Sequence, residues 1–425
     1  MKIELPYGKT KLSAELPSER VAAMLHSRLA DLEPCAPAET LVEQALANPI
    51  GSPPLWELAR GKKRVVLLAS DHTRPVPSRV IVPAMLREVR RGNPQAEITI
   101  LVATGCHRGS TAAELEQKFG PELCASERIL VHDCARDPMV DLGTLPSGAP
   151  LEVNQVAAQA DLLIAEGFIE PHFFAGFSGG RKSVLPGVCS SRTVYANHCA
   201  ALIGDPHARS GCLEGNPVHR DMVEGARRAG LRFIVNVACN GRKQVVAAFA
   251  GELEKAHLAG VEFLYGACRL EMEQPAGIVI TGNGGYPLDQ NIYQAVKGMS
   301  TADIVCREGG VIIMASACAD GHGGESFYRT FAGGETAGEI LERIERTPME
   351  ETTPDQWQAQ ILARVMAKHP VVLVSDQPPG LVRRMGLIPA ATLPEAVELA
   401  DGILGRREQI VVIPDGVACI PGLKR

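Results

Sequence analysis

Aromatic residues are scarce in this 425-residue chain, at 4% of the sequence, so its cores must be built mainly from Ala, Val, Leu and Ile. No apolar run approaches the length of a membrane span, and the N-terminus lacks the apolar core of a signal peptide. Neither sign of charge dominates, since 43 basic residues stand against 49 acidic ones. Such a balance gives no electrostatic footprint for nucleic acid. We therefore expect neither a membrane nor a nucleic-acid partner.

Paired cysteines are also missing. The twelve cysteines are scattered singly with no CxxC pair, and no HExxH segment occurs, so the spacing typical of zinc sites is absent. Because there is no export signal, reduced thiols are the better interpretation, and we expect the chain to work in the cytoplasm. The sequence leaves the oligomeric state open.

What the sequence does contain is a repeated succession of a short apolar run, a polar glycine-rich loop and a helical pattern. Continuous apolar runs that alternate with helices indicate parallel strands buried on both faces. The predicted class is α/β with mostly parallel sheets. Eight runs carry this prediction: residues 64–69, 98–103, 162–165, 233–238, 278–281, 311–315, 371–375 and 410–413.

A chain of this length is too long for one core, so we expect two α/β domains with the active site in the cleft between them. A break near residues 266–276 separates a helical stretch from a new strand. The predicted domains are residues 1–268 and residues 276–407. The final segment, 408–425, is expected to return and complete the first domain.

Polar loops follow four of the predicted strands. Ligands of open α/β sheets bind outside the carboxyl ends of the strands, so these loops are expected to face each other across the cleft. They are SDHTRP (70–75), TGCHRGST (104–111), EGFIEPH (166–172) with the glycine-rich residues 175–187, and GNGGYP (282–287).

Two of these loops carry cations suited to an anionic ligand. Arg74 follows a strand and precedes a proline, where a guanidinium can clamp a carboxylate at two points. A structural salt bridge with Asp71 is the other interpretation, and the two can coexist. The segment GFSGGRKS (176–183) resembles a P-loop, but Arg181 stands where that motif requires glycine. Its glycines and its two cations, Arg181 and Lys182, still suggest contact with a phosphate.

Three histidines, His107, His172 and His198, lie in the same neighbourhood. A lone histidine is more often a structural residue than a catalyst. A pair, however, can exchange acid and base roles near neutral pH, and racemisation needs one such group on each face of the reacting carbon.

Taken together, these segments resemble the nickel-pincer-nucleotide-dependent lactate racemase family of 2-hydroxy acid racemases and epimerases. The similarity extends from about residue 64 to residue 362 in the family's order. The matching segments are SDHTRPVP (70–77), ATGCHRGST (103–111), GFIEPHFFAGFSGGRKSVLPGV (167–188), YANH (195–198), LDQNIYQAVKG (288–298) and PDQWQAQIL (354–362).

The resemblance implies a nicotinic-acid-derived nucleotide joined to Lys182 by a thioamide, with its nickel(II) ligated by His198. The first domain would hold this cofactor, and the second would close over the substrate. His107 and His172 would be the general acid and base. The remaining expected contacts are Gly105, Ser178, Gly179 and Gly180 to the cofactor, and Asp71, Arg74, Tyr293, Gln294, Lys297 and Trp357 to the substrate.

The resemblance further implies racemisation by hydride transfer. One histidine takes the hydroxyl proton while the Cα hydride moves to the cofactor, and return to the opposite face of a 2-keto acid gives the other enantiomer. The expected partners are a small 2-hydroxy acid, most simply lactate, and cofactor-biosynthesis proteins that act transiently.

Several alternatives stay open. The substrate could be a longer aliphatic 2-hydroxy acid or malate, although no extra arginine is evident for a second carboxylate. A nicotinamide-dependent dehydrogenase is disfavoured because no GxGxxG opens a helix directly after a strand. A non-catalytic phosphate- or metal-binding module would not need the His107/His172 pair. His322 and Glu325 could line the pocket or form a structural turn.

Overall fold

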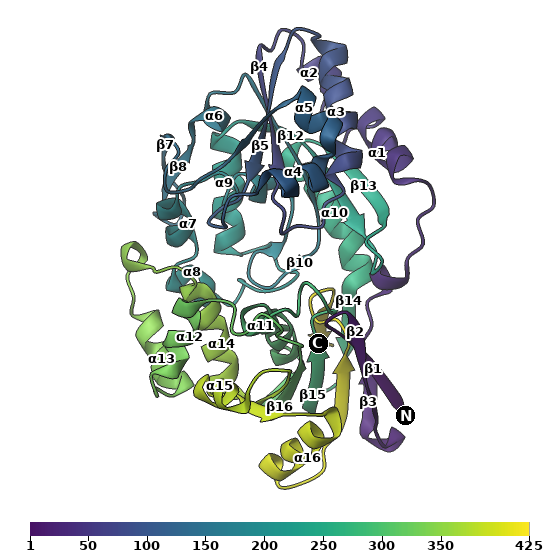
Figure 1. Ribbon diagram of the computed structural model, residues 1–425, viewed down its shortest axis with the longest axis vertical. Helices are drawn as coiled ribbons and strands as arrows, with labels where there is room; N and C mark the ends of the chain where they lie inside the picture. The colour runs from purple at the N-terminus through teal and green to yellow at the C-terminus, as the bar shows by residue number, and fades with distance from the viewer. Residues whose placement is uncertain (425) are drawn as a thin grey trace.

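The computed structural model describes residues 1–424, which form two lobes around two six-stranded sheets (Figure 1). The first sheet has the order β13-β12-β9-β4-β5-β6, and all neighbours are parallel except the antiparallel pair β12 and β13. Its strands are β4 (Arg64–Ser70), β5 (Glu97–Ala103), β6 (Arg128–Val131), β9 (Leu162–Phe168), β12 (Leu231–Cys239) and β13 (Val245–Gly251).

The second sheet has the order β18-β17-β16-β15-β19-β3 and is parallel throughout. Its strands are β3 (Val21–Met24), β15 (Ala276–Gly282), β16 (Cys306–Ala315), β17 (Val371–Val374), β18 (Ile388–Ala390) and β19 (Ile410–Ile413). Smaller two-stranded sheets are formed by β1 (Lys2–Tyr7) with β2 (Thr10–Glu15), β7 (Met139–Thr144) with β8 (Pro150–Asn154), β10 (Pro171–His172) with β11 (Gly176–Phe177), and β14 (Arg269–Met272) with β20 (Ile420–Leu423).

All eight apolar runs that were predicted to be strands lie in the two large sheets, and the α/β class with mostly parallel sheets is confirmed. The expected return of the last strand to the first domain is wrong. β19 lies between β15 and β3 in the second sheet, with Ile410 opposite Ile278 on one side and Val21 on the other. The run IVVI is fully buried, and its backbone hydrogen-bonding groups are paired on both edges by parallel strands of the second sheet.

The helices cover the faces of both sheets (Figure 1). Those of the first lobe are α1 (Ala38–Ala47), α2 (Leu55–Leu58), α3 (Ser78–Gly92), α4 (Ala112–Phe119), α5 (Pro121–Ser126), α6 (Gln155–Ala158), α7 (Ser191–Asn197), α8 (Ala200–Gly204), α9 (Pro217–Arg228) and α10 (Leu253–Cys268). Those of the second are α11 (Ile292–Asp303), α12 (Glu325–Ala332), α13 (Ala337–Glu345), α14 (Gln356–Lys368), α15 (Pro379–Arg384) and α16 (Leu393–Leu404). Within residues 1–424, none of the helices has the length and apolar character needed to cross a membrane.

The two lobes share a hydrophobic core. One cluster of buried side chains runs from Val66 and Leu68 in the first sheet to Met314 and Leu373 in the second. β10 lies where the lobes meet, so the polar loop that follows β9 is placed at their junction (Figure 1).

Candidate functional site

Asp71 and His107 form a hydrogen-bonded pair at the ends of β4 and β5. Nδ1 of His107 lies 2.7 Å from Oδ2 of Asp71, and Oδ1 of Asp71 accepts a hydrogen bond from the Thr73 hydroxyl at 2.6 Å. Burial alone would raise the pKa of Asp71, but the hydrogen bond to His107 and the charges around it hold that pKa at about 2. The ionised carboxylate keeps the Nδ1 proton on His107, so Nε2 of this 45% exposed ring presents a lone pair.

Arg74 does not form the salt bridge with Asp71 that the sequence allowed. Its Nη1 donates to the Thr73 hydroxyl at 2.8 Å, and Thr73 in turn donates to Asp71. The Asp71 carboxylate therefore reaches the Arg74 guanidinium only through Thr73, while the backbone N–H of Arg74 donates to the Asp71 carbonyl at 3.3 Å. Asp71 is 1% exposed, and its carboxylate oxygens bind Thr73 and His107, so it orients these two side chains. Arg74 itself is exposed and free to bind an anion.

His172 faces the same region from β10. The backbone N–H of Ala175 donates to Nδ1 of His172 at 3.2 Å, so the Nε2 of this ring carries the proton. Burial, together with the charges of Lys182, Lys297 and two arginines, lowers the pKa of His172 well below its ordinary value. The two predicted acid/base histidines therefore present opposite groups, a lone pair on His107 and an N–H on His172.

Lys182 lies in a short 3-10 helix, η3 (Gly180–Ser183), and its Nζ is 5.6 Å from the centre of the Phe174 ring. Burial, with the charges of Arg181, Arg74 and Lys297, lowers the pKa of Lys182 well below its usual value. No carboxylate of residues 1–424 lies within ion-pair distance of this amine. Burial and the neighbouring cations therefore favour the uncharged, nucleophilic form of the Lys182 amine.

Arg181 does not act as the second phosphate-binding cation predicted from the GFSGGRKS segment. It is 1% exposed, and its guanidinium donates to the backbone carbonyls of Ala175 and Phe177 at 2.9 and 2.8 Å. It also contacts Nε2 of His257 at 2.8 Å and Nδ1 of His219 at 3.1 Å. Burial lowers its pKa to about 9. Arg181 thus holds the loop that presents Lys182.

Several of the residues expected to contact the cofactor form hydrogen bonds within the protein. The N–H of Gly105 donates to Gly187 at 2.9 Å, and that of Gly180 donates to the Asn236 side chain at 2.8 Å. The Ser178 hydroxyl lies 2.9 Å from the N–H of Glu170, and Gly179 adopts a φ of 80°. These residues shape the loop, so any contact with the cofactor must come from their remaining surfaces.

His198 follows α7 and has one ring nitrogen available. Its Nδ1 donates to the carbonyl of Val194 at 2.8 Å, which leaves the lone pair on Nε2. Burial and the nearby Lys182 lower the pKa of His198 to about 3, so the ring is neutral. A buried neutral imidazole whose second nitrogen is fixed by a carbonyl is the usual form of a metal-ligating histidine.

The second lobe adds the residues expected on the substrate side. Nζ of Lys297 is 6.0 Å from the centre of the Phe173 ring, and the Trp357 ring lies 5.0 Å from that of His198. Burial and the charge of Arg74 lower the pKa of Lys297 to about 8, which Glu170 opposes. Oε1 of Gln294 is buried without a partner among the described residues.

Tyr293 leads to a residue that the sequence did not single out. Its hydroxyl donates to the carboxylate of Asp355, whose burial raises the pKa of Asp355 while Tyr293 and His107 oppose that rise. Asp355 precedes α14 and has a φ of 65°, which is uncommon for a residue other than glycine. Only its place beside Trp357 in the PDQW segment could have pointed to it.

Glu170 and Thr73 were missed as well. The Glu170 carboxyl lies near the charges of Lys297, Arg74 and Lys243, and burial raises its pKa against their influence. The sequence placed Glu170 in a strand-end loop but gave no sign that three cations surround it. Thr73 was overlooked because a threonine in a loop carries no distinctive pattern.

His322 and Glu325 form a turn at the start of α12. Nδ1 of His322 accepts the N–H of Gly324 at 3.2 Å, and its ring stacks on Tyr328 with 4.8 Å between the ring centres. Nε2 of His322 lies 3.8 Å from Glu325. These contacts support the structural interpretation of the pair.

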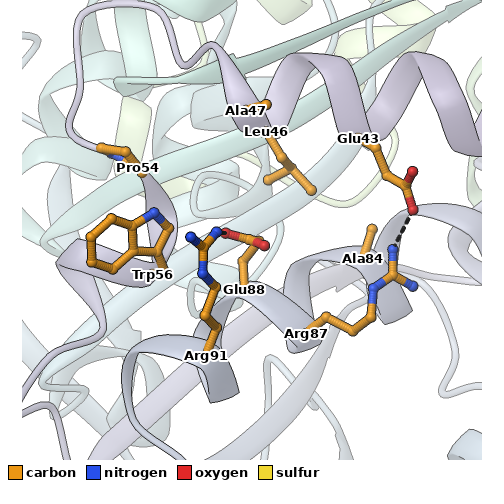
Figure 2. Close-up of a pocket in the computed structure, with 9 residues that line it drawn as sticks. All are labelled: Glu43, Leu46, Ala47, Pro54, Trp56, Ala84, Arg87, Glu88 and Arg91. Atoms are coloured by element: carbon orange, nitrogen blue, oxygen red, sulfur yellow. Dashed lines mark hydrogen bonds and ion pairs between the residues drawn. The ribbon is translucent and has the colours of Figure 1, made fainter.

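A surface pocket of about 460 Å³ lies elsewhere, between α1, α2 and α3 (Figure 2). Its charged side chains pair with one another, Arg87 with Glu43 at 2.6 Å and Arg91 with Glu88 at 3.4 Å. None of the residues predicted to be functional lines it, so it is not the candidate site.

The chain is similar to known proteins over nearly its whole length. The chain is 51% identical to the lactate racemase of Thermoanaerobacterium thermosaccharolyticum over 98% of both chains, and 48% identical to that of Lactiplantibacillus plantarum over 98% of this chain and 99% of the other. The solved apoprotein of the former superposes with a TM-score of 0.95 at 50% identity, covering 99% of this chain and 100% of that one.

A Thermotoga maritima protein of known structure, 19% identical, shares the fold alone, with a TM-score of 0.64 over 91% of this chain and 98% of the other. Residues 7–211 match the lactate racemase N-terminal domain, and residues 271–421 match the lactate racemase C-terminal domain. Since these two matches cover most of the sequence and the identity holds over nearly its whole length, the chain belongs to the lactate racemase family.

Proposed function

We propose that this protein is an isomerase that interconverts D- and L-lactate. The observation that carries the proposal is the environment of Lys182, a buried amine whose pKa is lowered well below its usual value and which lies close to a neutral histidine, His198, with a free ring nitrogen. The near-full-length identity to two lactate racemases supports the choice of reaction.

The residues fit the cofactor that the family resemblance implies. An uncharged amine is the form of Lys182 that can be acylated, and so can carry the thioamide link to a nicotinic-acid-derived nucleotide. Nε2 of His198 is suited to ligate nickel(II), which accepts imidazole readily. When bound, this nickel-pincer nucleotide supplies a reversible acceptor for the hydride on Cα of the substrate.

The protein's own groups handle the proton and the charge. His107, with its Nδ1 proton directed to Asp71, takes the proton of the 2-hydroxyl at Nε2, and His172 presents an Nε2–H to the oxygen on the other side. The two histidines exchange these roles in the reverse direction. Arg74 and Lys297 bind the carboxylate, so the planar 2-keto acid stays bound and the hydride can return to either of its two faces.

The choice of lactate rests on the second lobe. We place Tyr293, Gln294 and Trp357 on the substrate side, where their side chains are compatible with a small aliphatic group. We further propose that the cofactor is delivered by separate biosynthetic proteins and that the enzyme works in the cytoplasm.

The test is to express the chain together with the cofactor-making proteins and to measure intact mass, nickel content and racemisation of L-lactate by chiral chromatography. We expect added mass on Lys182, bound nickel and formation of D-lactate, and we expect none of these in Lys182→Ala. An unmodified, nickel-free chain under these conditions would contradict the proposal. Parallel assays with malate and longer 2-hydroxy acids decide the substrate.

A further inference from the structure

The loop of residues 70–78 carries much of the candidate site on a short length of chain. It begins with Ser70, the last residue of β4, and ends with Ser78, the first residue of α3. Asp71 and Arg74 lie between them, with Arg74 four positions from either end. Any displacement of the backbone at the ends of this loop therefore moves the Arg74 guanidinium.

One buried carboxylate binds both ends of this loop. Oε1 of Glu166 accepts the backbone N–H of Ser70 at 2.8 Å and the Ser70 hydroxyl at 2.9 Å. The same oxygen accepts the Ser78 hydroxyl at 3.1 Å. Glu166 is 1% exposed, and it lies on β9, whose register with β4 pairs Ala165 with Leu68. The rigid centre of the sheet thus fixes the position of Glu166.

The middle of the loop is held by other groups. The Lys118 amine donates to the carbonyl of Arg74 at 3.3 Å, and Asp71 accepts the backbone N–H of Thr73 at 3.1 Å. These contacts shape the turn but do not tie it to the sheet. Only the Glu166 contacts link the loop's two ends to a neighbouring strand through a side chain, among the hydrogen bonds of residues 1–424.

We propose that Glu166 is a positioning residue for the racemase reaction: its carboxylate holds both ends of loop 70–78 so that Arg74 meets the substrate carboxylate and Asp71 meets His107. The inference rests on the proposed function. Glu166 acts through the loop and touches no reacting atom. Loss of its acceptor leaves buried donors unsatisfied and frees the loop, and a displacement of about 1 Å can cost on the order of a hundredfold in rate.

The first test compares Glu166→Ala with Glu166→Gln, because glutamine keeps an acceptor oxygen in the same place. In the cofactor-loaded enzyme we expect Glu166→Ala to raise KM for lactate roughly tenfold or more, while Glu166→Gln stays near the wild-type value. The matched control is Asp161→Ala. Asp161 accepts the N–H of Arg64 at 2.8 Å at the opposite ends of β4 and β9, so its loss leaves KM unchanged.

The second test needs no cofactor. Hydrogen exchange of the peptide covering residues 70–78 in the empty chain is expected to be faster in Glu166→Ala than in the wild type, and unchanged in Glu166→Gln and Asp161→Ala. If Glu166→Ala does not fold, Ser78→Ala removes one of the hydrogen bonds to Glu166 and should give a smaller increase in exchange.

Two results would overturn the inference: an unchanged KM and unchanged exchange in Glu166→Ala, or a Glu166→Gln variant as defective as Glu166→Ala. If instead the loaded wild type does not racemise lactate, it is the proposed function that fails. The exchange comparison on the empty chain then still decides whether Glu166 holds the loop.

Discussion

Lys297 is expected to titrate near the upper end of the physiological pH range. Burial and the charge of Arg74 lower its pKa to about 8. Below that pH the ammonium group is charged and binds the substrate carboxylate, and above it the charge is lost. We therefore expect KM for lactate to rise as pH increases through about 8. The measurement is KM against pH for the loaded wild type and for Lys297→Arg, in which the permanent charge should abolish the rise. A flat wild-type profile would exclude Lys297 from carboxylate binding.

Asp71 gives a second prediction for a single residue. With a pKa of about 2 its carboxylate is ionised at every working pH and fixes the Nδ1 proton of His107. The substitution Asp71→Asn keeps the shape of the side chain but removes its charge. The His107 ring is then no longer held in the tautomer that has its proton on Nδ1 and its lone pair on Nε2. We expect kcat to fall by about 10²- to 10⁴-fold. Intact mass should show Lys182 still modified, and a wild-type kcat would refute the assigned role.

The element that presents Lys182 depends on a glycine with an unusual backbone. Gly179 has a φ of 80°, and a Cβ there would lie 2.8 Å from the carbonyl oxygen of Phe168 and 2.9 Å from Oδ1 of Asn236. Gly179→Ala is expected to lower the free energy of unfolding by about 1–3 kcal/mol, through strain and steric overlap. Chemical denaturation measures this.

Gly266→Ala provides the control for that variant. Gly266 lies in α10, and a Cβ there would meet nothing within 4 Å. Alanine favours the helical conformation, so this substitution should leave stability unchanged or raise it by up to about 1 kcal/mol. Equal losses in both variants would mean that the conformation of Gly179 is unimportant.

At the level of elements, the sequence predicted where the strands lie along the chain better than it predicted which strands are adjacent in a sheet. Runs such as residues 278–281 and 410–413 are apolar because they are buried on both faces, and this pattern can be recognised from the sequence alone. The pattern does not say which strands are adjacent, so β19 was assigned to the wrong sheet. The division at residues 266–276 remains a proposal, and β14, which lies within it, pairs with β20 near the end of the chain.

For the side chains of the candidate site, too, the sequence identified residues but not their contact partners. His107, His172, Lys182 and His198 could be identified because the family resemblance covers them. The inward orientation of Arg181 could not, because its partners are backbone carbonyls that leave no trace in the sequence. Asp71 was placed in the right loop, but its partner, His107, became evident only with β4 and β5 side by side.

The whole molecule builds its candidate site from both lobes. The Gln360 side chain donates to the carbonyl of Ala200 at 2.9 Å, joining α14 to α8 across the junction. Trp357 then reaches His198, and Lys297 reaches Phe173. The first lobe alone therefore has Arg74 but lacks the second proposed carboxylate-binding cation, Lys297, and the Trp357 ring beside His198. Binding of the cofactor to the first lobe should consequently change the surroundings of the second-lobe residues that lie beside it.

The chain's two tryptophans allow this to be measured. The Trp357 ring centre lies 5.0 Å from that of His198, whereas Trp56 lines the surface pocket of the first lobe, beside Arg91 (Figure 2). A nickel-bearing nucleotide beside His198 is expected to quench Trp357 strongly, because contact quenching falls off steeply with distance. Comparing empty and loaded Trp56→Phe should show a marked loss of emission, and the same comparison in Trp357→Phe only a small one. Equal quenching in both variants would mean that the second lobe does not cover the cofactor through Trp357, and that the two lobes do not share one site.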